Sequence, residues 1–223
     1  MSTITITKPS ALLHMAGLDL KALFGAVLAH ASDDEDDLPD LTKVHVEVRE
    51  GELRLACTDR YTLAVVRRSL SSTTDGFTCQ YALPLGEIKA LLKDIGDSGV
   101  HLTFEENQVR ATFREETSVI SGCVSGVPWR MALNRMLEPA DTPTGRIAIN
   151  PRFLARLESA MPLSPAEPMR LQMCGEHKAV IATLGTSFLA LIMPVRTRSV
   201  GDEQPEDRPL DGWFDLLDET PSA

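Results

Sequence analysis

The sequence lacks the features that would place it in a membrane or a secretory pathway. None of its apolar runs approaches the roughly 20 residues that a helix needs to cross a bilayer. It does not start with a basic region followed by an apolar stretch, as a secretory signal does. Its 223 residues are enough to bury a core. We therefore expect a globular, cytoplasmic protein with no membrane partner.

Paired cysteines and catalytic motifs are also missing. There is no CxxC pair, so we expect four reduced thiols buried in strands, at Cys57, Cys79, Cys123 and Cys174. Five histidines are scattered, and we expect surface or strand positions for them, not metal ligation: His14, His30, His45, His101 and His177. The chain has no Gly-x-Ser-x-Gly, phosphate-binding glycine loop or His-Glu-x-x-His. Asp59 follows Thr58 in a short connection, where aspartate usually caps backbone amides. We predict a non-catalytic protein with no cofactor and no metal.

Basic residues are outnumbered, with 22 Lys and Arg against 32 Asp and Glu, a net charge of −10. This balance excludes a protein that covers nucleic acid with its whole surface, but it is compatible with DNA contact on one face. One acidic cluster spans residues 33–37 and another lies in residues 201–223. The first lacks the spaced ligands and turn glycine of a calcium-binding EF-hand, so we predict a solvated loop there.

The chain contains one pattern three times: a short strand, an amphipathic helix, then alternating strands. In the first copy the pattern predicts a helix over 17–31 and strands at 44–49, 53–57 and 61–67. In the second it predicts a strand at 79–84, a helix over 85–95 ended by Gly96, and strands at 100–104, 108–113 and 117–124. In the third it predicts a strand at 146–150, a helix with the apolar stripe Phe153, Leu154, Leu157 and Met161, and strands at 169–173, 179–183 and 187–194.

These patterns divide the chain into an N-terminal arm (1–10), a domain of two half-repeats (11–138, made of 11–70 and 78–138), a linker (139–145), a third half-repeat (146–198) and an acidic tail (199–223). We predict that the tail is disordered apart from a short apolar motif that docks on a surface, formed by Leu210, Trp213, Phe214, Leu216 and Leu217.

Four short motifs carry a resemblance to a known family. They are Leu55-Ala56-Cys57-Thr58-Asp59 followed by Leu63-Ala64-Val65, then Tyr81-Ala82-Leu83-Pro84, then Val127-Pro128-Trp129, and finally Ala190-Leu191-Ile192-Met193-Pro194-Val195-Arg196. In this order they resemble the beta subunit of bacterial DNA polymerase III, a sliding clamp, over about residues 11–198. The third motif departs in detail from the family's Phe-Pro-aromatic sequence. The resemblance implies the α+β class and a DNA-clamp fold, with tandem βαβββ half-domains, antiparallel sheets outside and helices on one face.

The resemblance also implies a processivity or recruitment factor of DNA replication or repair. Its partners would be DNA polymerases or other proteins with clamp-binding peptides, and double-stranded DNA bound without sequence preference. The implied peptide pocket consists of Thr58, Arg60, Tyr61, Leu63, Pro84 and Ile88 on one wall and Met193, Pro194, Val195 and Arg196 on the other. The implied DNA-facing helices carry Lys21, Lys89, Lys93, Arg152 and Arg156.

Each implied site has an ordinary structural alternative. Residues 193–195 can be a strand end that covers a core, and the helix cations can be a solvated surface. The chain resembles one full clamp domain and half of another, so a closed ring is doubtful and the odd half can pair with a second chain. A non-encircling adaptor, which binds clamp partners or a full-length clamp, is therefore the alternative function. The tail motif can occupy the pocket in cis, occupy another clamp in trans, or pack on a strand edge.

Overall fold

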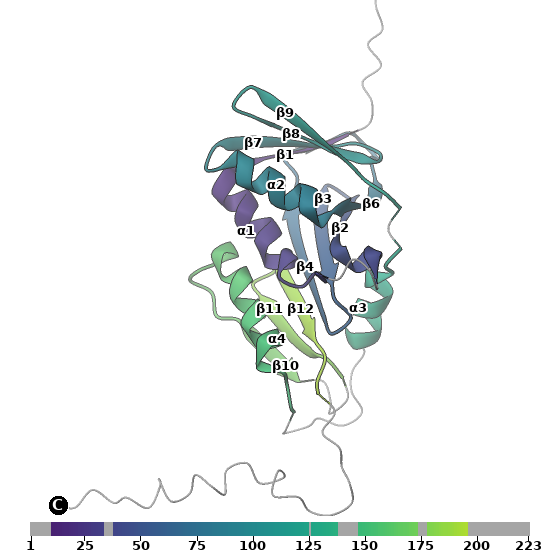
Figure 1. The fold of residues 1–223 in the computed structure, drawn as a ribbon, viewed down its shortest axis with the longest axis vertical. Helices are drawn as coiled ribbons and strands as arrows, with labels where there is room; N and C mark the ends of the chain where they lie inside the picture. The colour runs from purple at the N-terminus through teal and green to yellow at the C-terminus, as the bar shows by residue number, and fades with distance from the viewer. Residues whose placement is uncertain (1–9, 34–37, 125, 138–146, 174–177, 196–223) are drawn as a thin grey trace, which may run out of the picture.

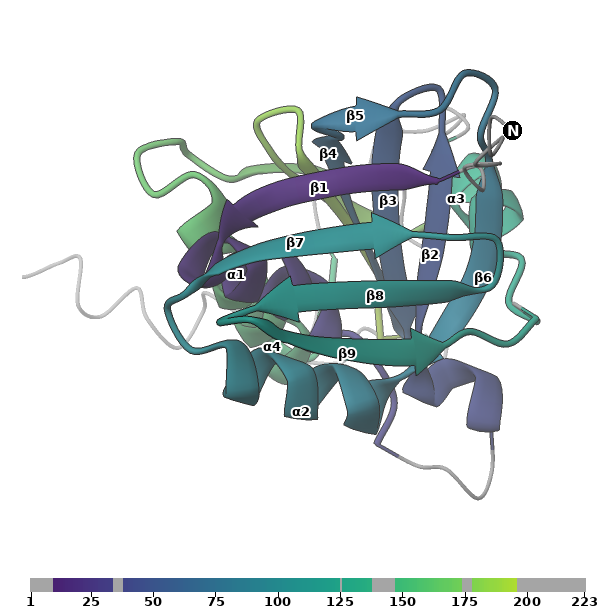
Figure 2. The same ribbon diagram turned by 90° about the horizontal axis from the view of Figure 1, so that it is seen from above.

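Two antiparallel sheets and the helices packed against them form the fold (Figures 1 and 2). The computed structural model describes residues 10–33, 38–124, 126–137, 147–173 and 178–195. Its strands are β1 (Ala11–Ala16), β2 (Lys43–Arg49), β3 (Glu52–Thr58), β4 (Thr62–Ser69), β5 (Ser72–Thr73), β6 (Cys79–Pro84), β7 (Gly99–Phe104), β8 (Gln108–Phe113), β9 (Glu116–Ser121), β10 (Arg170–Met173), β11 (Val180–Leu184) and β12 (Phe188–Ile192). Its helices are α1 (Gly17–Leu28), α2 (Leu85–Ile95), α3 (Trp129–Leu137) and α4 (Pro151–Ala155), with 3-10 segments η1 (Pro39–Thr42) and η2 (Arg156–Leu163).

The first two half-repeats exchange their opening strands. The five-stranded sheet has the order β5-β1-β7-β8-β9, so β1 of the first half-repeat joins the strands of the second. In return, β6 of the second half-repeat pairs with β2 of the first. Both sheets pack on α1 and α2 around one core, whose largest fully buried side chains include Phe24, Leu55 and Phe104. The exchange ties the two half-repeats into one unit.

The third half-repeat extends the second sheet of this unit. Its order is β10-β11-β12-β4-β3-β2-β6, and β12 pairs with β4 in antiparallel register, with Leu191 opposite Leu63. On one face of this sheet, α1 contacts η2, and Leu157 and Ala160 of η2 belong to the common core. We call this the inner face, and the opposite one the outer face.

The outer face is not bare, which corrects the expectation of helices on one face only. Helix α3 packs on it, and its Trp129 is buried with Ala56, Leu63, Ile181 and Leu191 in a second, smaller cluster. The alternation of strand side chains explains this cluster: neighbouring residues of β3, β4 and β12 point to the inner core, and these point outward. Sequence patterns did not predict α3.

Most predicted elements agree with the structure, and the third half-repeat holds the main differences. Residues 147–150 do not form a strand. The predicted apolar stripe is also wrong in part, because Leu154 and Met161 are 37% and 55% exposed, while Leu157 is buried. Helix α4 ends after five residues and continues as 3-10 turns, which rotate later side chains away from the α-helical stripe. In the first half-repeat, strand β1 was not predicted.

Two predictions about isolated side chains are correct only in part. Cys57 and Cys79 are buried as expected and their pKa values are raised by burial, that of Cys79 to about 11, but Cys123 is exposed. Cys174 and His177 lie outside the described residues. Among the histidines, His14, His45 and His101 lie on strands β1, β2 and β7, as predicted, whereas His30 is fully buried just after α1.

Acid should destabilise the fold through His30. Neither ring nitrogen has a hydrogen-bond partner among the described residues, and burial, with the nearby Arg156 charge, lowers the pKa of His30 from 6.5 to about 4. The unfolded chain binds the proton more readily, so the stability conferred by the neutral ring is present above pH 6.5 and is lost as pH falls toward 4, by about 3 kcal/mol.

The matching experiment compares the wild type with His30→Leu in denaturant titrations at pH 7.5 and 4.5. Every other titrating group is common to both proteins, so the wild type should lose about 2–3 kcal/mol more than the variant between these pH values. Equal losses would show that His30 is not the group responsible.

Candidate functional site

The pairing of β4 with β12 brings together two segments that are 130 residues apart in sequence. Thr62 lies opposite Ile192, and the Met193 N–H donates a 2.8 Å hydrogen bond to the carbonyl oxygen of Tyr61. The end of the final strand therefore borders the turn between β3 and β4. Thr58, Arg60, Tyr61, Leu63 and Met193, all predicted as pocket residues, meet at this point.

Hydrogen bonds fix the turn over residues 58–62. Asp59 Oδ1 accepts from the Tyr61 N–H at 3.0 Å and from the Thr62 N–H at 2.7 Å, as predicted for an aspartate in this position. The Thr58 hydroxyl donates to the Thr62 carbonyl at 2.6 Å and accepts from the Arg60 N–H at 3.2 Å. Arg60 has a φ of 79°, in the left-handed region, so the turn holds a backbone geometry that a non-glycine residue rarely adopts.

Arg156 locks this turn from the third half-repeat. Its guanidinium lies 2.5 Å from Asp59 Oδ2 and 2.7 Å from the Thr62 hydroxyl, and it sits 5.2 Å from the ring of Phe153. The Phe153 ring in turn stacks on Tyr61, with centroids 5.7 Å apart. Arg156, expected to face DNA, thus has its charge paired with a carboxylate of the turn.

A cavity of about 100 Å³ lies beside this turn on the outer face. Its lining comes from the turn, from β12 and from α3: Thr58, Arg60, Tyr61, Thr62, Leu63, Val127, Trp129, Ala132, Met136, Leu191 and Met193. We call it the junction pocket. The predicted pocket residues Pro84 and Ile88 are not part of it. Ile88 is fully buried in the inner core, and Pro84 pairs with Lys43 on β6, the edge strand far from β12.

The wall that sequence reasoning missed is α3. Trp129, Leu133 and Met136 follow one another at spacings of four and three residues, directly after Pro128, which is the pattern of a short amphipathic helix. This spacing of apolar residues is the sequence signal for α3.

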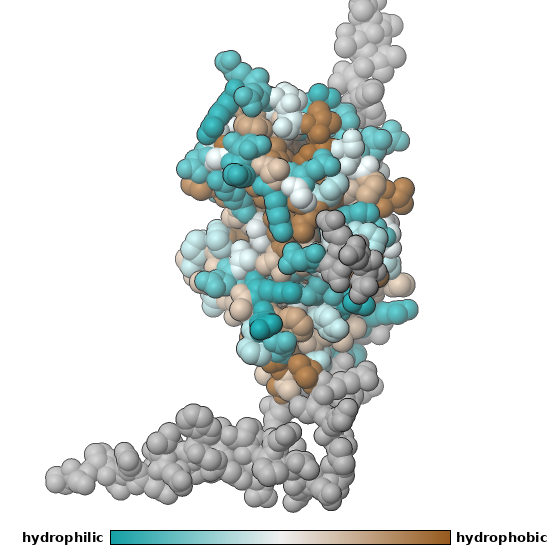
Figure 3. All heavy atoms as spheres, viewed as in Figure 1, coloured by the Kyte–Doolittle hydropathy of each residue, from teal (hydrophilic) through white to brown (hydrophobic). Residues whose placement is uncertain are grey.

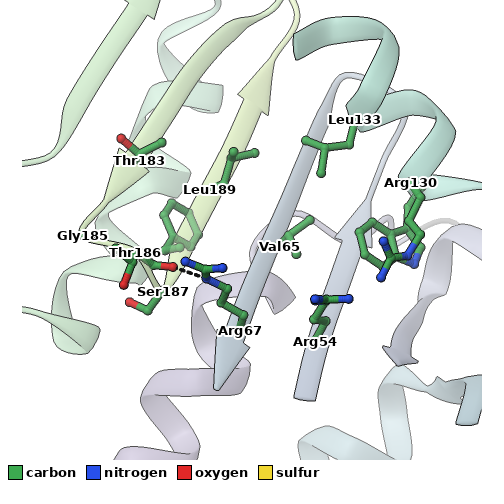
Figure 4. A pocket seen from close by; sticks show the side chains of 12 residues that line it. Arg54, Val65, Arg67, Arg130, Leu133, Thr183, Gly185, Thr186, Ser187 and Leu189 are labelled. Atoms are coloured by element: carbon green, nitrogen blue, oxygen red, sulfur yellow. Dashed lines mark hydrogen bonds between the residues drawn. The ribbon is translucent and has the colours of Figure 1, made fainter. Parts of the chain in front are cut away.

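A second, larger cavity of about 410 Å³ adjoins the other side of Trp129 (Figure 4). Its apolar floor includes Val65, Leu133 and Leu189, and three arginines line it, Arg54, Arg67 and Arg130. We call it the arginine pocket. Figure 4 shows the three guanidinium groups around this floor, with Arg67 donating to the Thr186 carbonyl oxygen.

Two carboxylates only partly neutralise these arginines. Glu47, 6% exposed, accepts from Arg130 and lies 3.3 Å from Arg54, while Glu52 pairs with Arg54 at 2.8 Å and Arg67 at 3.9 Å. Glu47 also raises the pKa of Arg130 through this hydrogen bond. Arg67 lies 3.9 Å from its carboxylate partner and its side chain is 51% exposed, so of the three arginines it is the one best placed to meet an acidic group.

The remaining site predictions fall in different environments. Lys21 lies 3.6 Å from Asp97 and Lys89 lies 3.7 Å from Asp33, whereas Lys93 and Arg152 are exposed. Pro194 is half-buried, and Val195 is 48% exposed beside residue 148, to which it donates a backbone hydrogen bond. Arg196 and the tail motif (Leu210, Trp213, Phe214, Leu216 and Leu217) lie outside the described residues.

No helix in the described part of the chain is long and apolar enough to cross a bilayer. Within the same ranges, no group of three or more His, Cys, Asp or Glu side chains is placed to hold a metal ion.

Comparison with solved structures shows that this arrangement is the sliding-clamp fold. The DNA polymerase III beta subunit of Pseudomonas aeruginosa has a TM-score of 0.60 at 12% identity, over 84% of this chain and 65% of that one. The beta subunit of Thermotoga maritima has a TM-score of 0.62 at 14% identity, over 89% and 69%. A P. aeruginosa clamp bound to griselimycin has a TM-score of 0.63 at 13% identity, over 89% and 67%. The present chain thus spans about two thirds of the length of these clamps.

The sequence itself also matches a family model. Residues 18–127 match the model described as DNA polymerase III beta subunit, central domain. The matched range contains β2–β9, α2 and all of α1 except its first residue. A comparison with curated proteins gives no match.

The lock between Arg156 and Asp59 gives a testable expectation for stability. In Arg156→Gln, the carboxylate of Asp59, whose side chain is only 10% exposed, would lose its cationic partner. We expect the free energy of unfolding to fall by about 1–3 kcal/mol. Arg152→Gln, four residues earlier on α4, is the matched control, and because Arg152 is exposed, its effect should stay within about 0.5 kcal/mol. Guanidinium titrations of both variants measure this, and equal effects would contradict the lock.

Proposed function

We propose that the chain is a clamp-type recruitment factor of DNA replication or repair, which binds short peptides of DNA polymerases at the junction of β4 and β12. The observation that carries the proposal is the contact between Met193 and Tyr61, which places the end of the final strand against the turn that lines the junction pocket. A groove of apolar and sulphur-bearing side chains adapts to several large apolar residues, as peptide recognition requires.

The arginine pocket extends the same proposal. It shares Trp129 with the junction pocket, so a peptide that places an apolar side chain near Met193 can reach the arginines with an acidic side chain or a terminal carboxylate. The solved clamp that holds griselimycin supports the general point that a protein of this fold binds a ligand.

The helix cations favour a non-encircling adaptor over a clamp that encircles DNA, because most of them are close to carboxylates. Of the five cations expected to face DNA, three lie within ion-pair distance of carboxylates, namely Lys21, Lys89 and Arg156. Lys89, Lys93 and Arg152 are exposed, and three exposed cations in a chain of net charge −10 give weak attraction for phosphates. The processivity clamp remains the second candidate, favoured by the shared fold alone.

One experiment tests both forms of the function. The full chain is titrated with a fluorescently labelled clamp-binding peptide of a bacterial DNA polymerase, and its retention on nicked circular DNA is compared with that on linear DNA. Saturable peptide binding without topology-dependent retention supports the adaptor, and retention on circles alone supports the clamp. Neither binding nor retention would overturn the proposed function.

A further inference from the structure

The third half-repeat ends in an exposed strand with apolar side chains. Strand β10 is the last strand of the seven-stranded sheet, and all four of its residues are exposed, with Leu171 at 55% and Met173 at 49%. Leu154 on α4 and Met161 on η2 are also exposed. In Figure 3, hydrophobic side chains reach the surface at the lower end of the molecule, where Figure 1 places α4 and β10.

The first two half-repeats show what such a strand normally pairs with. Strand β7 pairs with β1 and strand β2 pairs with β6, so the second strand of each half-repeat takes the opening strand of its mate. Strand β10 holds the position of β2 and β7, because it is followed by two further antiparallel strands of its own half-repeat. The strand expected beside β10 is therefore the opening strand of another half-repeat.

The opening segment of the third half-repeat is already in place to serve as such a strand. In each half-repeat, a residue after the last strand bonds back to the opening segment: the Ser71 N–H to the Leu12 carbonyl at 2.8 Å, the Cys123 N–H to the Ala82 carbonyl at 2.9 Å, and the Val195 N–H to the Ala148 carbonyl at 2.8 Å. Ala148 thus corresponds to Leu12 and Ala82.

The three half-repeats differ on the other side of this opening segment. Leu12 pairs across to Thr103 on β7, and Ala82 pairs across to His45 on β2. For residues 147–150, the described part of the chain provides no strand on that side, and the segment forms no ladder. Among the described residues, the third half-repeat therefore has two complementary edges, 147–150 and β10, and each corresponds to the strand that the other two half-repeats pair with their mates.

We propose that a second copy of this chain supplies the mate. A two-fold axis would set residues 147–150 of each copy beside β10 of the other, as the pseudo-symmetric exchange does within residues 11–121. Each edge is satisfied by the same operation, which is the property of an isologous interface. The contact between α1 and α2 predicts that the two α4–η2 segments lie side by side, and this covers Leu154 and Met161. The inference does not depend on the proposed peptide binding.

The first test is the mass of the full chain in solution, by analytical ultracentrifugation. We expect a dimer, and Leu171→Glu with Met173→Glu should raise its dissociation constant about 100-fold or more, because two unpaired carboxylates per copy replace apolar contacts. The matched control is Val119→Glu, an apolar-to-acid change of a 44% exposed residue on β9, the edge of the other sheet. The proposal is overturned if the full chain stays monomeric, for example because its own tail covers the edge. It is also overturned if Val119→Glu weakens the dimer as much as the double substitution does.

Disulfide trapping tests the arrangement itself. His45, the partner of Ala82, lies opposite Ala56, and Gln172 lies opposite Ile181 in the same outer-face cluster, so Gln172 is the counterpart of His45. In a Cys123→Ser, Cys174→Ser background, Ala148→Cys with Gln172→Cys should give a reducible cross-linked dimer on oxidation. Ala148→Cys with Thr117→Cys, on β9, should not. Labelled-peptide binding, measured on the same proteins, separates a failed dimer from a failed binding function.

Discussion

Replacing Met193 with aspartate should weaken binding of the labelled polymerase peptide by about 100-fold or more. Met193 lines the junction pocket and its backbone fixes the end of β12 against Tyr61. A carboxylate at this position would either lose its hydration when a peptide binds or keep water in the pocket, and central apolar residues of an interface commonly account for 2 kcal/mol or more. The backbone hydrogen bond from residue 193 does not depend on the side chain, so the fold should persist.

The matched control for this variant is Met131→Asp. Met131 is 49% exposed on α3 and does not line either outer-face pocket. Fluorescence anisotropy should show near-native affinity for Met131→Asp and little binding for Met193→Asp, while both keep the far-ultraviolet circular dichroism of the wild type. Unchanged affinity in Met193→Asp would remove the junction pocket as the peptide site.

The sequence pattern predicted the elements whose apolar residues have a clear local periodicity. Residues 108–113 alternate with period two and form β8, and residues 85–95 carry an apolar stripe and form α2, ended by Gly96 at a φ of 60°. Strand β1 escaped prediction because Ala11–Ala16 has few β-branched residues and its main partner, β7, lies more than 80 residues away. Residues 147–150 have a strand-like alternation, but a strand needs a partner, and the described chain provides none on the open side.

The site was predictable where a motif matched and unpredictable where tertiary packing decided. Thr58, Leu63 and Met193 meet as the resemblance implied. Arg152 and Arg156 were expected on one helix face because they are four residues apart, but α4 ends between them and the 3-10 turn directs Arg156 to Asp59. Spacing cannot reveal where a helix tightens.

On α1, the addition of a methyl group by Gly17→Ala should cause a large loss of stability. A Cβ at Gly17 would lie 2.6 Å from the Gly96 carbonyl oxygen and 2.8 Å from that of Ser98. Both atoms belong to the backbone after α2, so they cannot rotate away, and we expect a loss of about 3 kcal/mol from overpacking. Differential scanning calorimetry of the full chain measures this.

Gly25→Ala, on the same helix, is the control, because we expect it to change stability in the opposite direction. A Cβ at Gly25 meets nothing within 4 Å, so the exchange should stabilise the helix by about 0.5–1 kcal/mol, since alanine orders at less entropic cost than glycine. If both variants lose stability alike, then α1 and α2 do not pack as closely as described. Peptide affinity of the folded Gly17→Ala protein should stay native, because the strain falls between α1 and α2 and the junction pocket is built by β4, β12 and α3. The stability of the exchanged half-repeats and the chemistry of the pocket are thus expected to respond to separate substitutions.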